Sequence, residues 1–170
     1  VNPRACHETE LNYLPVRTVK RIAVVGAGPA GLAAATVAAE RGHAVTLFDA
    51  ASEIGGQFNV AKRVPGKEEF FETLRYFRNK VKSTGVDLRL NTRVDVQALV
   101  GGGFDEIILA TGIAPRTPAI AGVEHAKVLS YLDVLLERKP VGKSVAVIGA
   151  GGIGFDVSEY LVHELSLIHI

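Results

Sequence analysis

Residues 21–49 read RIAVVGAGPAGLAAATVAAERGHAVTLFD, and this stretch decides the fold. A short apolar run over residues 21–25 ends at a glycine, which is typical of a buried parallel strand. Small apolar residues recur at three- and four-residue spacing over residues 29–41 and predict a helix, which Gly42 ends. A second apolar run over residues 44–49 predicts another strand. Together they have the length of a βαβ unit, in which a helix connects two parallel strands.

A glycine pattern, G-x-G-x-x-G, lies between the first strand and the helix at Gly26, Gly28 and Gly31. Gly26 allows a tight turn, Gly28 allows the backbone to approach a pyrophosphate, and Gly31 allows the helix to pack closely on the strand. The amide groups and the positive dipole end of the helix then face the phosphates. The pattern predicts a dinucleotide site, and the alternative is a turn with a purely structural role.

Asp49, at the end of the second strand, supports the dinucleotide interpretation. It lies 21 residues after Gly28, close to the spacing of about 20 residues expected for a carboxylate that binds ribose hydroxyls. A carboxylate also repels a 2′-phosphate, so this site is expected to bind FAD or NAD rather than NADP. The alternative is a surface aspartate at a strand end.

The apolar pattern of the following residues completes an α/β fold. It predicts an amphipathic helix over residues 67–83, a strand over 86–90 and a strongly apolar strand over 104–110. Residues 92–100 are interpreted as a strand followed by a turn, and one short helix is expected over 131–137. The predicted fold is a Rossmann-like FAD-binding domain with a parallel sheet, followed by the truncated start of a second Rossmann-like domain that binds NAD(P)H.

The opening unit recurs 123 residues further along the chain. Residues 143–151, KSVAVIGAG, repeat the pattern of residues 20–28, KRIAVVGAG. Its order in the chain makes the second glycine loop the candidate NAD(P)H site, and a structural turn is again the alternative. The residues that would select NAD or NADP belong about 20 positions further on, outside this sequence.

Composition excludes several classes of protein. A hydrophobic content of 48% and a formal net charge of +1 exclude a disordered chain, and the near-equal numbers of basic and acidic residues argue against a nucleic-acid partner. A single cysteine excludes a disulfide framework and a cysteine-only metal site. The uncharged run over residues 22–39 is rich in Ala and Gly, so we do not interpret it as a membrane-spanning helix. The first twenty residues show no signal peptide. We therefore expect a cytoplasmic location and no membrane association.

The order of the motifs resembles that of flavoproteins with two dinucleotide-binding domains. A glycine pair and Gln57 follow the second predicted strand, and the last strand ends in Ala110, Thr111 and Gly112. In that superfamily the glycine pair faces the flavin end of FAD, the Ala-Thr-Gly strand runs beside the cofactor, and NAD(P)H binds an inserted second domain.

Five segments narrow the resemblance to one family. Residues 1–8 (VNPRACHE) resemble the segment just after the iron–sulfur cysteines in multidomain reductases similar to old yellow enzyme. Within that group, four further segments closely resemble the bacterial-type NADPH-dependent 2,4-dienoyl-CoA reductases: residues 54–59 (IGGQFN), 65–70 (PGKEEF), 130–135 (SYLDVL) and 149–156 (GAGGIGFD). The resemblance implies an N-terminal barrel, absent here, that holds FMN and the acyl-CoA substrate, followed by a 4Fe-4S cluster. Electrons would pass from NADPH through FAD and the cluster to FMN, which reduces 2,4-dienoyl-CoA in unsaturated fatty acid β-oxidation.

The resemblance also implies which residues bind cofactors. The FAD contacts would be Gly26, Gly28, Ala30, Gly31, Asp49, Gly56, Gln57, Lys67, Val94, Ala110, Thr111 and Gly112, and the NAD(P)H loop would use Gly149, Gly151, Gly152 and Gly154. Lys67 would reach pyrophosphate or ribose oxygens, and Val94 would pair with adenine through its backbone. The alternatives are an exposed lysine at a helix start and a core valine.

The expected organisation follows from these assignments. Residues 1–17 form a linker after the absent barrel and cluster segment, 18–115 the FAD-binding domain, 116–143 a connector and 144–164 the start of the NAD(P)H domain. No catalytic residue or metal ligand is expected within the chain, because Cys6 and His7 are interpreted as linker side chains and a cluster needs several thiolates. The substrate would bind through the absent barrel, so the fragment alone is expected to be inactive.

Two other functions remain open. One is an electron-adaptor flavoprotein similar to the small subunit of glutamate synthase, which has comparable glycine loops. The other is a catalytically inactive nucleotide-binding fragment. A disulfide reductase with its redox cysteines in the FAD domain is disfavoured, because the sequence has one cysteine.

The last six residues, 165–170, read LSLIHI and do not continue the family pattern. They match one reading frame of a transposon-end adapter used in sequencing libraries, so we expect them to be an artefact and the genuine chain to end near Glu164. Resequencing of the native locus is expected to replace these codons. A genomic read that runs through them without adapter sequence would contradict the prediction.

Overall fold

The computed structural model describes residues 4–167 and divides them into two compact units. The first unit contains the residues up to Gly55 together with Tyr76–Thr111, and the second contains Gly56–Arg75 and the residues from Gly112 onward. Parts of two predicted segments, residues 1–3 of the linker and 168–170 of the adapter-derived tail, lie outside the described residues.

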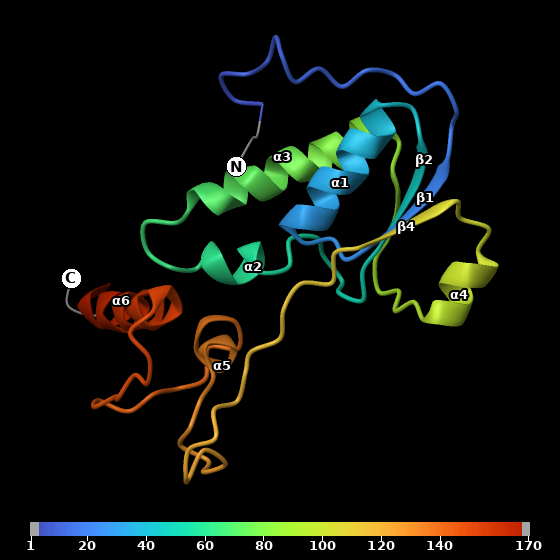
Figure 1. The fold of residues 1–170 in the computed structure, drawn as a ribbon. Helices are drawn as coiled ribbons and strands as arrows, with labels where there is room; N and C mark the ends of the chain where they lie inside the picture. Colours follow the sequence, from blue (N-terminus) through green and yellow to red (C-terminus); the bar gives the residue numbers. More distant parts are fainter. Residues whose placement is uncertain (1–3, 168–170) are drawn as a thin grey trace. The chain divides into compact units, whose positions relative to one another are not determined.

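The first unit is built on a four-stranded parallel sheet (Figure 1). The strands are β1 (Arg21–Val25), β2 (Ala44–Phe48), β3 (Asp87–Arg89) and β4 (Glu106–Leu109), in the order β3-β2-β1-β4. All three strand pairs are parallel. This arrangement confirms the predicted α/β Rossmann-like fold with a parallel sheet.

The central strand β1 is covered on both faces, which explains its continuous apolar sequence. Ala23 and Val24 point to opposite faces of the sheet, and both have no exposed surface. In contrast, β4 is an edge strand of the described sheet, and its Leu109 is 70% exposed.

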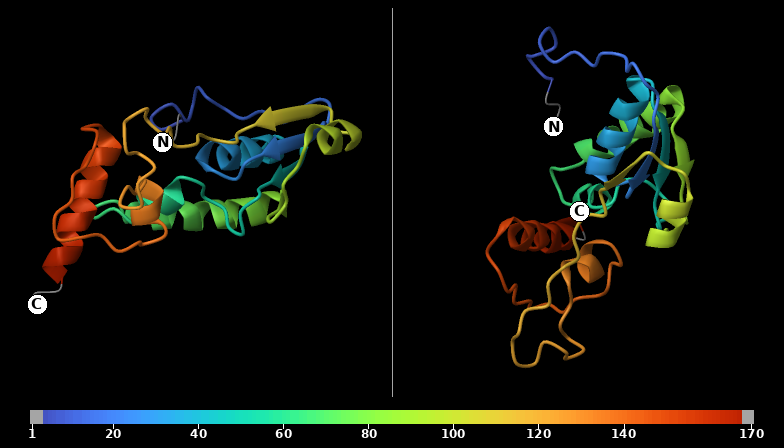
Figure 2. Two further views of the ribbon diagram at one scale, coloured as in Figure 1. Left: turned by 90° about the horizontal axis from the view of Figure 1, so that it is seen from below. Right: turned by 45° about the vertical axis from the view of Figure 1, so that its right-hand side comes forward.

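One face of the sheet packs against two helices, α1 (Pro29–Glu40) and the part of α3 (Glu69–Thr84) that lies in the first unit (Figure 2). The core between them and the sheet includes Leu32 of α1, Leu47 of β2 and Val81 of α3. The helix predicted over residues 67–83 is therefore confirmed within two residues at each end.

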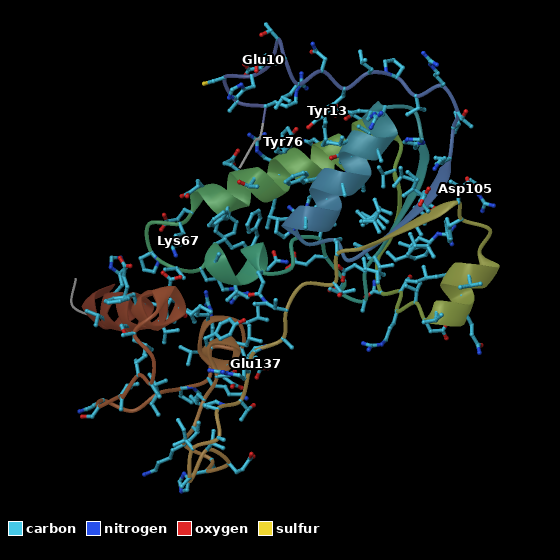
Figure 3. The ribbon with its side chains drawn as sticks, viewed as in Figure 1. Glu10, Tyr13, Lys67, Tyr76, Asp105 and Glu137 are labelled. Carbon is cyan, nitrogen blue, oxygen red and sulfur yellow. The ribbon has the colours of Figure 1, made fainter. Side chains whose placement is uncertain are left out.

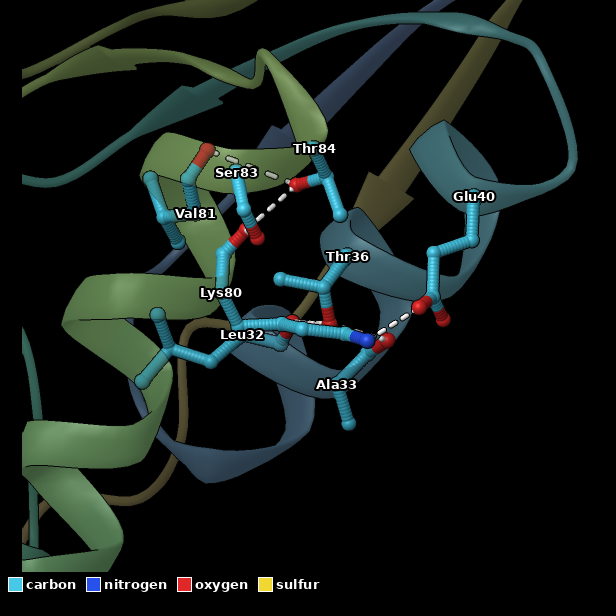
Figure 4. A network of polar contacts seen from close by, with 8 residues as sticks. All are labelled: Leu32, Ala33, Thr36, Glu40, Lys80, Val81, Ser83 and Thr84. Carbon is cyan, nitrogen blue, oxygen red and sulfur yellow. Dashed lines mark hydrogen bonds and ion pairs between the residues drawn. The ribbon is translucent and has the colours of Figure 1, made fainter.

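One ion pair links these two helices, and further polar contacts near it lie within each helix (Figure 4). Lys80 of α3 forms an ion pair with Glu40 of α1, and this contact raises the pKa of the lysine. The buried hydroxyl of Thr36 donates to the carbonyl oxygen of Leu32 at 2.8 Å, so it has a partner inside its own helix. The hydroxyl of Thr84 donates in the same way to Lys80, at 2.7 Å.

The other face of the sheet is covered by α4 (Val96–Gly101), which corrects the strand and turn predicted over residues 92–100. Asp95 explains the difference, because its carboxylate accepts a hydrogen bond from the Ala98 amide at 2.8 Å and caps the helix. Leu99 then packs with Ala23 and Phe48 against the sheet.

The second unit contains three whole helices, α2 (Phe58–Ala61), α5 (Tyr131–Leu135) and α6 (Gly152–Leu167), together with the start of α3. They share a core of buried side chains, namely Val60, Val64, Val134, Leu135, Val157 and Tyr160. The helix α2 was not predicted from the sequence, whereas α5 confirms the short helix expected over residues 131–137. Within the described residues no helix has the length and apolar character needed to cross a membrane.

A capping box holds the start of α5. Asp133 and Ser130 exchange hydrogen bonds between side chain and backbone, and Lys139 pairs with the same carboxylate. The hydrogen bonds from Lys139 and Ser130 hold the pKa of Asp133 well below its usual value.

The strand that the repeated sequence predicted before Gly149 does not form. Residues 145–150 belong to no helix or strand, and Ile148 is 77% exposed. A strand needs a neighbour to pair its backbone groups, and the four strands of the described sheet pair only with one another.

Replacing Leu47 with Ala tests the core of the first unit. Leu47 has no exposed surface, so we expect Leu47→Ala to reduce the free energy of unfolding by about 2–5 kcal/mol. The matched control is Leu14→Ala, because Leu14 is 70% exposed and this substitution is expected to change stability by no more than about 0.5 kcal/mol. Urea unfolding followed by circular dichroism measures both, and equal effects would contradict the assignment of the core.

Candidate nucleotide-binding site

The glycine loop lies at the carboxyl end of β1, where it leads directly into α1. Gly26 has a φ of +106°, and a Cβ atom there would lie 2.3 Å from the carbonyl oxygen of Ala110. A Cβ atom at Gly31 would lie 1.8 Å from the carbonyl oxygen of Gly26. Both positions therefore require glycine for steric reasons.

The first turn of α1 begins with donors that no capping side chain covers. Gly28 is the N-cap in an extended conformation (φ −74°, ψ −178°), and Pro29 follows it. Glycine has no side chain to accept from the first amides of the helix, and these amides lie at the positive end of its dipole. Ala30, another predicted FAD contact, lies in this turn, which has the chemistry of an anion site.

The side chain of Asp49 points at the glycine loop. One carboxylate oxygen accepts from the Ala27 amide at 2.5 Å, and the other accepts from the Ala51 amide at 2.7 Å. The residue is partly buried and bonded to the loop, and its predicted contact with ribose stays a prediction. Each carboxylate oxygen can accept a further bond, which leaves capacity for ribose hydroxyls.

The chain after β3, which leads to Val94, runs beside residues 49–51. The Thr92 amide donates to the carbonyl oxygen of Asp49 at 2.8 Å, and the Asn91 amide donates to that of Ala51 at 2.9 Å. The side chain of Val94 packs on the α4 side of the sheet and lines a cavity of about 370 Å³. This position is compatible with a core valine and leaves the predicted adenine contact untested.

The end of β4 lies against the glycine loop. The Ala110 amide donates to the carbonyl oxygen of Val25 at 2.8 Å, and the Ala110 carbonyl faces Gly26. The first unit therefore brings together Gly26, Gly28, Ala30, Gly31, Asp49, Val94, Ala110 and Thr111.

The remaining predicted FAD contacts belong to the second unit, namely Gly56, Gln57, Lys67 and Gly112. Gln57 precedes α2, and its side-chain oxygen lies 3.4 Å from the Tyr131 hydroxyl. The ammonium group of Lys67 lies 2.7 Å from each carboxylate oxygen of Asp156. Lys67 is therefore paired within the second unit and is not simply solvated.

The second glycine loop reproduces the backbone of the first, although no strand precedes it. Gly149 has a φ of +116°, and a Cβ atom at Gly154 would lie 2.0 Å from the carbonyl oxygen of Gly149. The Phe155 amide donates to the carbonyl oxygen of Gly151 at 3.1 Å, as the Leu32 amide does to Gly28 in the first loop at 2.9 Å. The predicted Gly152 begins α6.

The fold and site define a class of nucleotide-dependent oxidoreductases. Their features are a parallel α/β sheet with a glycine loop at the end of β1 and, later in the chain, a second loop of the same geometry. The sequence matches the profile of the pyridine nucleotide-disulphide oxidoreductases over residues 20–169. The chain belongs to this family of FAD- and NAD(P)-binding oxidoreductase domains.

Named relatives are similar over almost the whole chain. A metal reductase of Desulforamulus reducens is 34% identical over 98% of this chain and 26% of its own length. A cinnamate reductase of Clostridium sporogenes is 38% identical over 96% of the chain and 24% of its own length. A solved structure of a 2-naphthoyl-CoA reductase complex has 32% identity and a TM-score of 0.90 over 96% of the chain and 25% of its own. The chain thus spans about a quarter of the length of these relatives.

The hydrogen bonds of Asp49 to the glycine loop predict how fast two backbone amides exchange hydrogen with water. Asp49→Asn replaces one acceptor oxygen with a donor, so either the Ala27 or the Ala51 amide loses its acceptor. We expect the free energy of unfolding to fall by about 1–3 kcal/mol, with faster hydrogen exchange at one of the two amides. The control is Asp87→Asn, which changes an exposed carboxylate paired with Arg89. Unchanged exchange at both amides would contradict the contact.

Proposed function

We propose that the chain is the FAD-binding half, with the start of the NADPH-binding domain, of an enzyme like the NADPH-dependent 2,4-dienoyl-CoA reductases. The observation that carries the proposal is the pair of glycine loops with matching geometry, the first of which is bonded to the carboxylate of Asp49. Two of the three relatives support it, because one is named as a reductase of cinnamate and another as a reductase of 2-naphthoyl-CoA, which is a CoA thioester.

The residues of this chain would bind and orient cofactors, and the substrate would meet other parts of the protein. The loop from Gly26 to Gly31 would hold the diphosphate of FAD at the start of α1, and Asp49 would accept from the adenosine ribose. These residues would hold FAD, which would supply the chemistry of accepting a hydride from NADPH and releasing electrons. FMN and a 4Fe-4S cluster belong, in this proposal, to the remaining three quarters of a protein like the relatives.

A second candidate is an electron-adaptor flavoprotein that delivers electrons to a partner and binds no organic substrate. The metal reductase among the relatives favours it, because reduction of a metal ion requires only electrons. The two candidates differ in the protein outside this chain, so the native full-length protein separates them. NADPH oxidation that depends on 2,4-dienoyl-CoA supports the first, and oxidation only with artificial electron acceptors supports the second.

Cofactor selection by the chain itself tests the shared part of the proposal. We expect the purified chain to retain FAD but not FMN after gel filtration, because the loop and Asp49 recognise the adenosine diphosphate half. ADP is expected to displace FAD, and 2′,5′-ADP to do so at least about tenfold more weakly, a difference of about 1.4 kcal/mol. Visible absorbance and flavin fluorescence measure the binding.

Two glycine variants complete this test. Gly31→Ala places a methyl group against the Gly26 carbonyl and is expected to abolish FAD retention, whereas Gly101→Ala adds the same group where no atom lies within 4 Å. Equal retention of FMN and FAD by the unaltered chain would refute recognition of the adenosine half.

A further inference from the structure

A cavity on the α4 side of the sheet lies outside the candidate nucleotide site. Its volume is about 370 Å³, and residues of β1, β2, β3 and α4 line it, all of them in the first unit. Neither the residues of the glycine loop nor Asp49 line it. Sites for small molecules have volumes of about 300–1,000 Å³, so this cavity is large enough for a small ligand.

Aromatic and aliphatic side chains form the apolar wall of the cavity. The rings of Phe48 and Phe104 are nearly perpendicular, at 88°, with their centroids 6.0 Å apart. Phe48 is 5% exposed, and Leu99 of α4 packs against it. The cavity therefore offers a ring face and a ring edge, which suit contact with another planar apolar group.

Three arginines, Arg21, Arg89 and Arg93, line the same cavity, and none of the described residues that line it is acidic. The guanidinium carbon of Arg21 lies 5.6 Å from the centroid of the Phe104 ring, and that of Arg89 lies 5.6 Å from the centroid of Phe48. Phe48 and Arg89 are register partners on β2 and β3, so they point to the same face of the sheet. A guanidinium that stacks on a ring keeps its N–H edge available for a carboxylate.

Hydrogen bonds restrain two of these arginines further. The carboxylate of Asp105, labelled in Figure 3, accepts from the Arg21 amide at 2.7 Å, and the Arg21 side chain donates to the carbonyl oxygen of Gly102 at 3.0 Å. The Arg89 side chain donates to Asp87 at 3.0 Å. A guanidinium has more N–H donors than these contacts use, so both arginines can still bind an anion. Because they are already restrained, they lose less side-chain entropy when they do so.

We propose that this cavity binds a small aromatic carboxylate. The carboxylate contacts the arginines, and the ring packs against Phe48 and Phe104. The excess of positive charge among the lining residues selects an anion, and the aromatic wall selects a planar apolar group on the same molecule. The site is separate from the glycine loop, so the inference does not rest on the proposed function.

Three small probes test the two halves of this recognition in the 170-residue chain. Benzoate has the ring and the charge, benzamide has the ring without the charge, and acetate has the charge without the ring. We expect benzoate to bind with a dissociation constant on the order of 1 mM and at least about fivefold more tightly than either of the other two. Nuclear magnetic resonance follows the backbone amides of Phe48 and Leu99, with the amide of Val134 in the second unit as the reference.

Two variants of lining residues locate the binding. Arg93 is exposed and lies outside the helices and strands, so Arg93→Gln removes a charged donor with little effect on the fold. It is expected to weaken benzoate binding about tenfold, as the loss of a charge-assisted hydrogen bond does. Ala98→Leu adds apolar atoms to the α4 wall, keeps a good helix former, and is expected to weaken benzoate binding by obstructing the cavity.

The matched control is Arg17→Gln, which makes the same change of charge at an exposed position that does not line the cavity. It is expected to leave benzoate binding within about twofold of the unaltered chain. Circular dichroism verifies that each variant keeps its helices.

The outcomes separate this inference from the proposed function. If benzoate causes no saturable shift, binds no more tightly than acetate or benzamide, or binds equally to Arg93→Gln and Arg17→Gln, the inference is overturned. Displacement of benzoate by ADP would assign the cavity to the nucleotide site and would also overturn it. If benzoate binds as expected and the chain binds no FAD, the proposed function fails and this inference stands.

Discussion

The close approach of three backbone segments governs the first unit. The end of β1, the start of α1 and the end of β4 meet at Gly26 and Gly31, where added Cβ atoms would lie 2.3 Å and 1.8 Å from carbonyl oxygens. These distances are far inside van der Waals contact, so no other residue fits without movement of the sheet or the helix. The same approach leaves the amides at the helix start uncovered by side chains. The close packing and the uncovered amides therefore have one steric cause.

Asp49 is the second element on which this arrangement depends. The sequence suggested a ribose contact, and the structure adds that the carboxylate binds the Ala27 amide inside the loop. The acid thus connects the end of β2 to the turn after β1 before any nucleotide is considered. In the proposed function the same carboxylate would also accept from a ribose hydroxyl, so one residue at this spacing would serve both purposes.

The sequence predicted helices and strands well where the period of apolar residues and the positions of glycines indicate the same element. It predicted them less well where a single contact determines whether the element forms. The βαβ unit has a continuous buried strand and an Ala-rich helix, and both were predicted within one residue. The helix α4 was wrongly interpreted as strand and turn, because its six residues are too few to show a period and its start depends on the Asp95 cap. The helix α2 has four residues and depends on packing with α5 and α6, which no local pattern reveals.

The second glycine loop shows which part of a nucleotide-binding unit is encoded locally. Its turn has the same positive φ and the same glycine-to-carbonyl contact as the first loop, yet residues 145–150 form no strand. Helix start and turn depend on residues within a few positions, whereas a strand exists only when another strand pairs with it. The sequence of this segment thus determines the turn by itself but determines the strand only together with a neighbour. The exposed Ile148 marks the apolar surface that such a neighbour would cover.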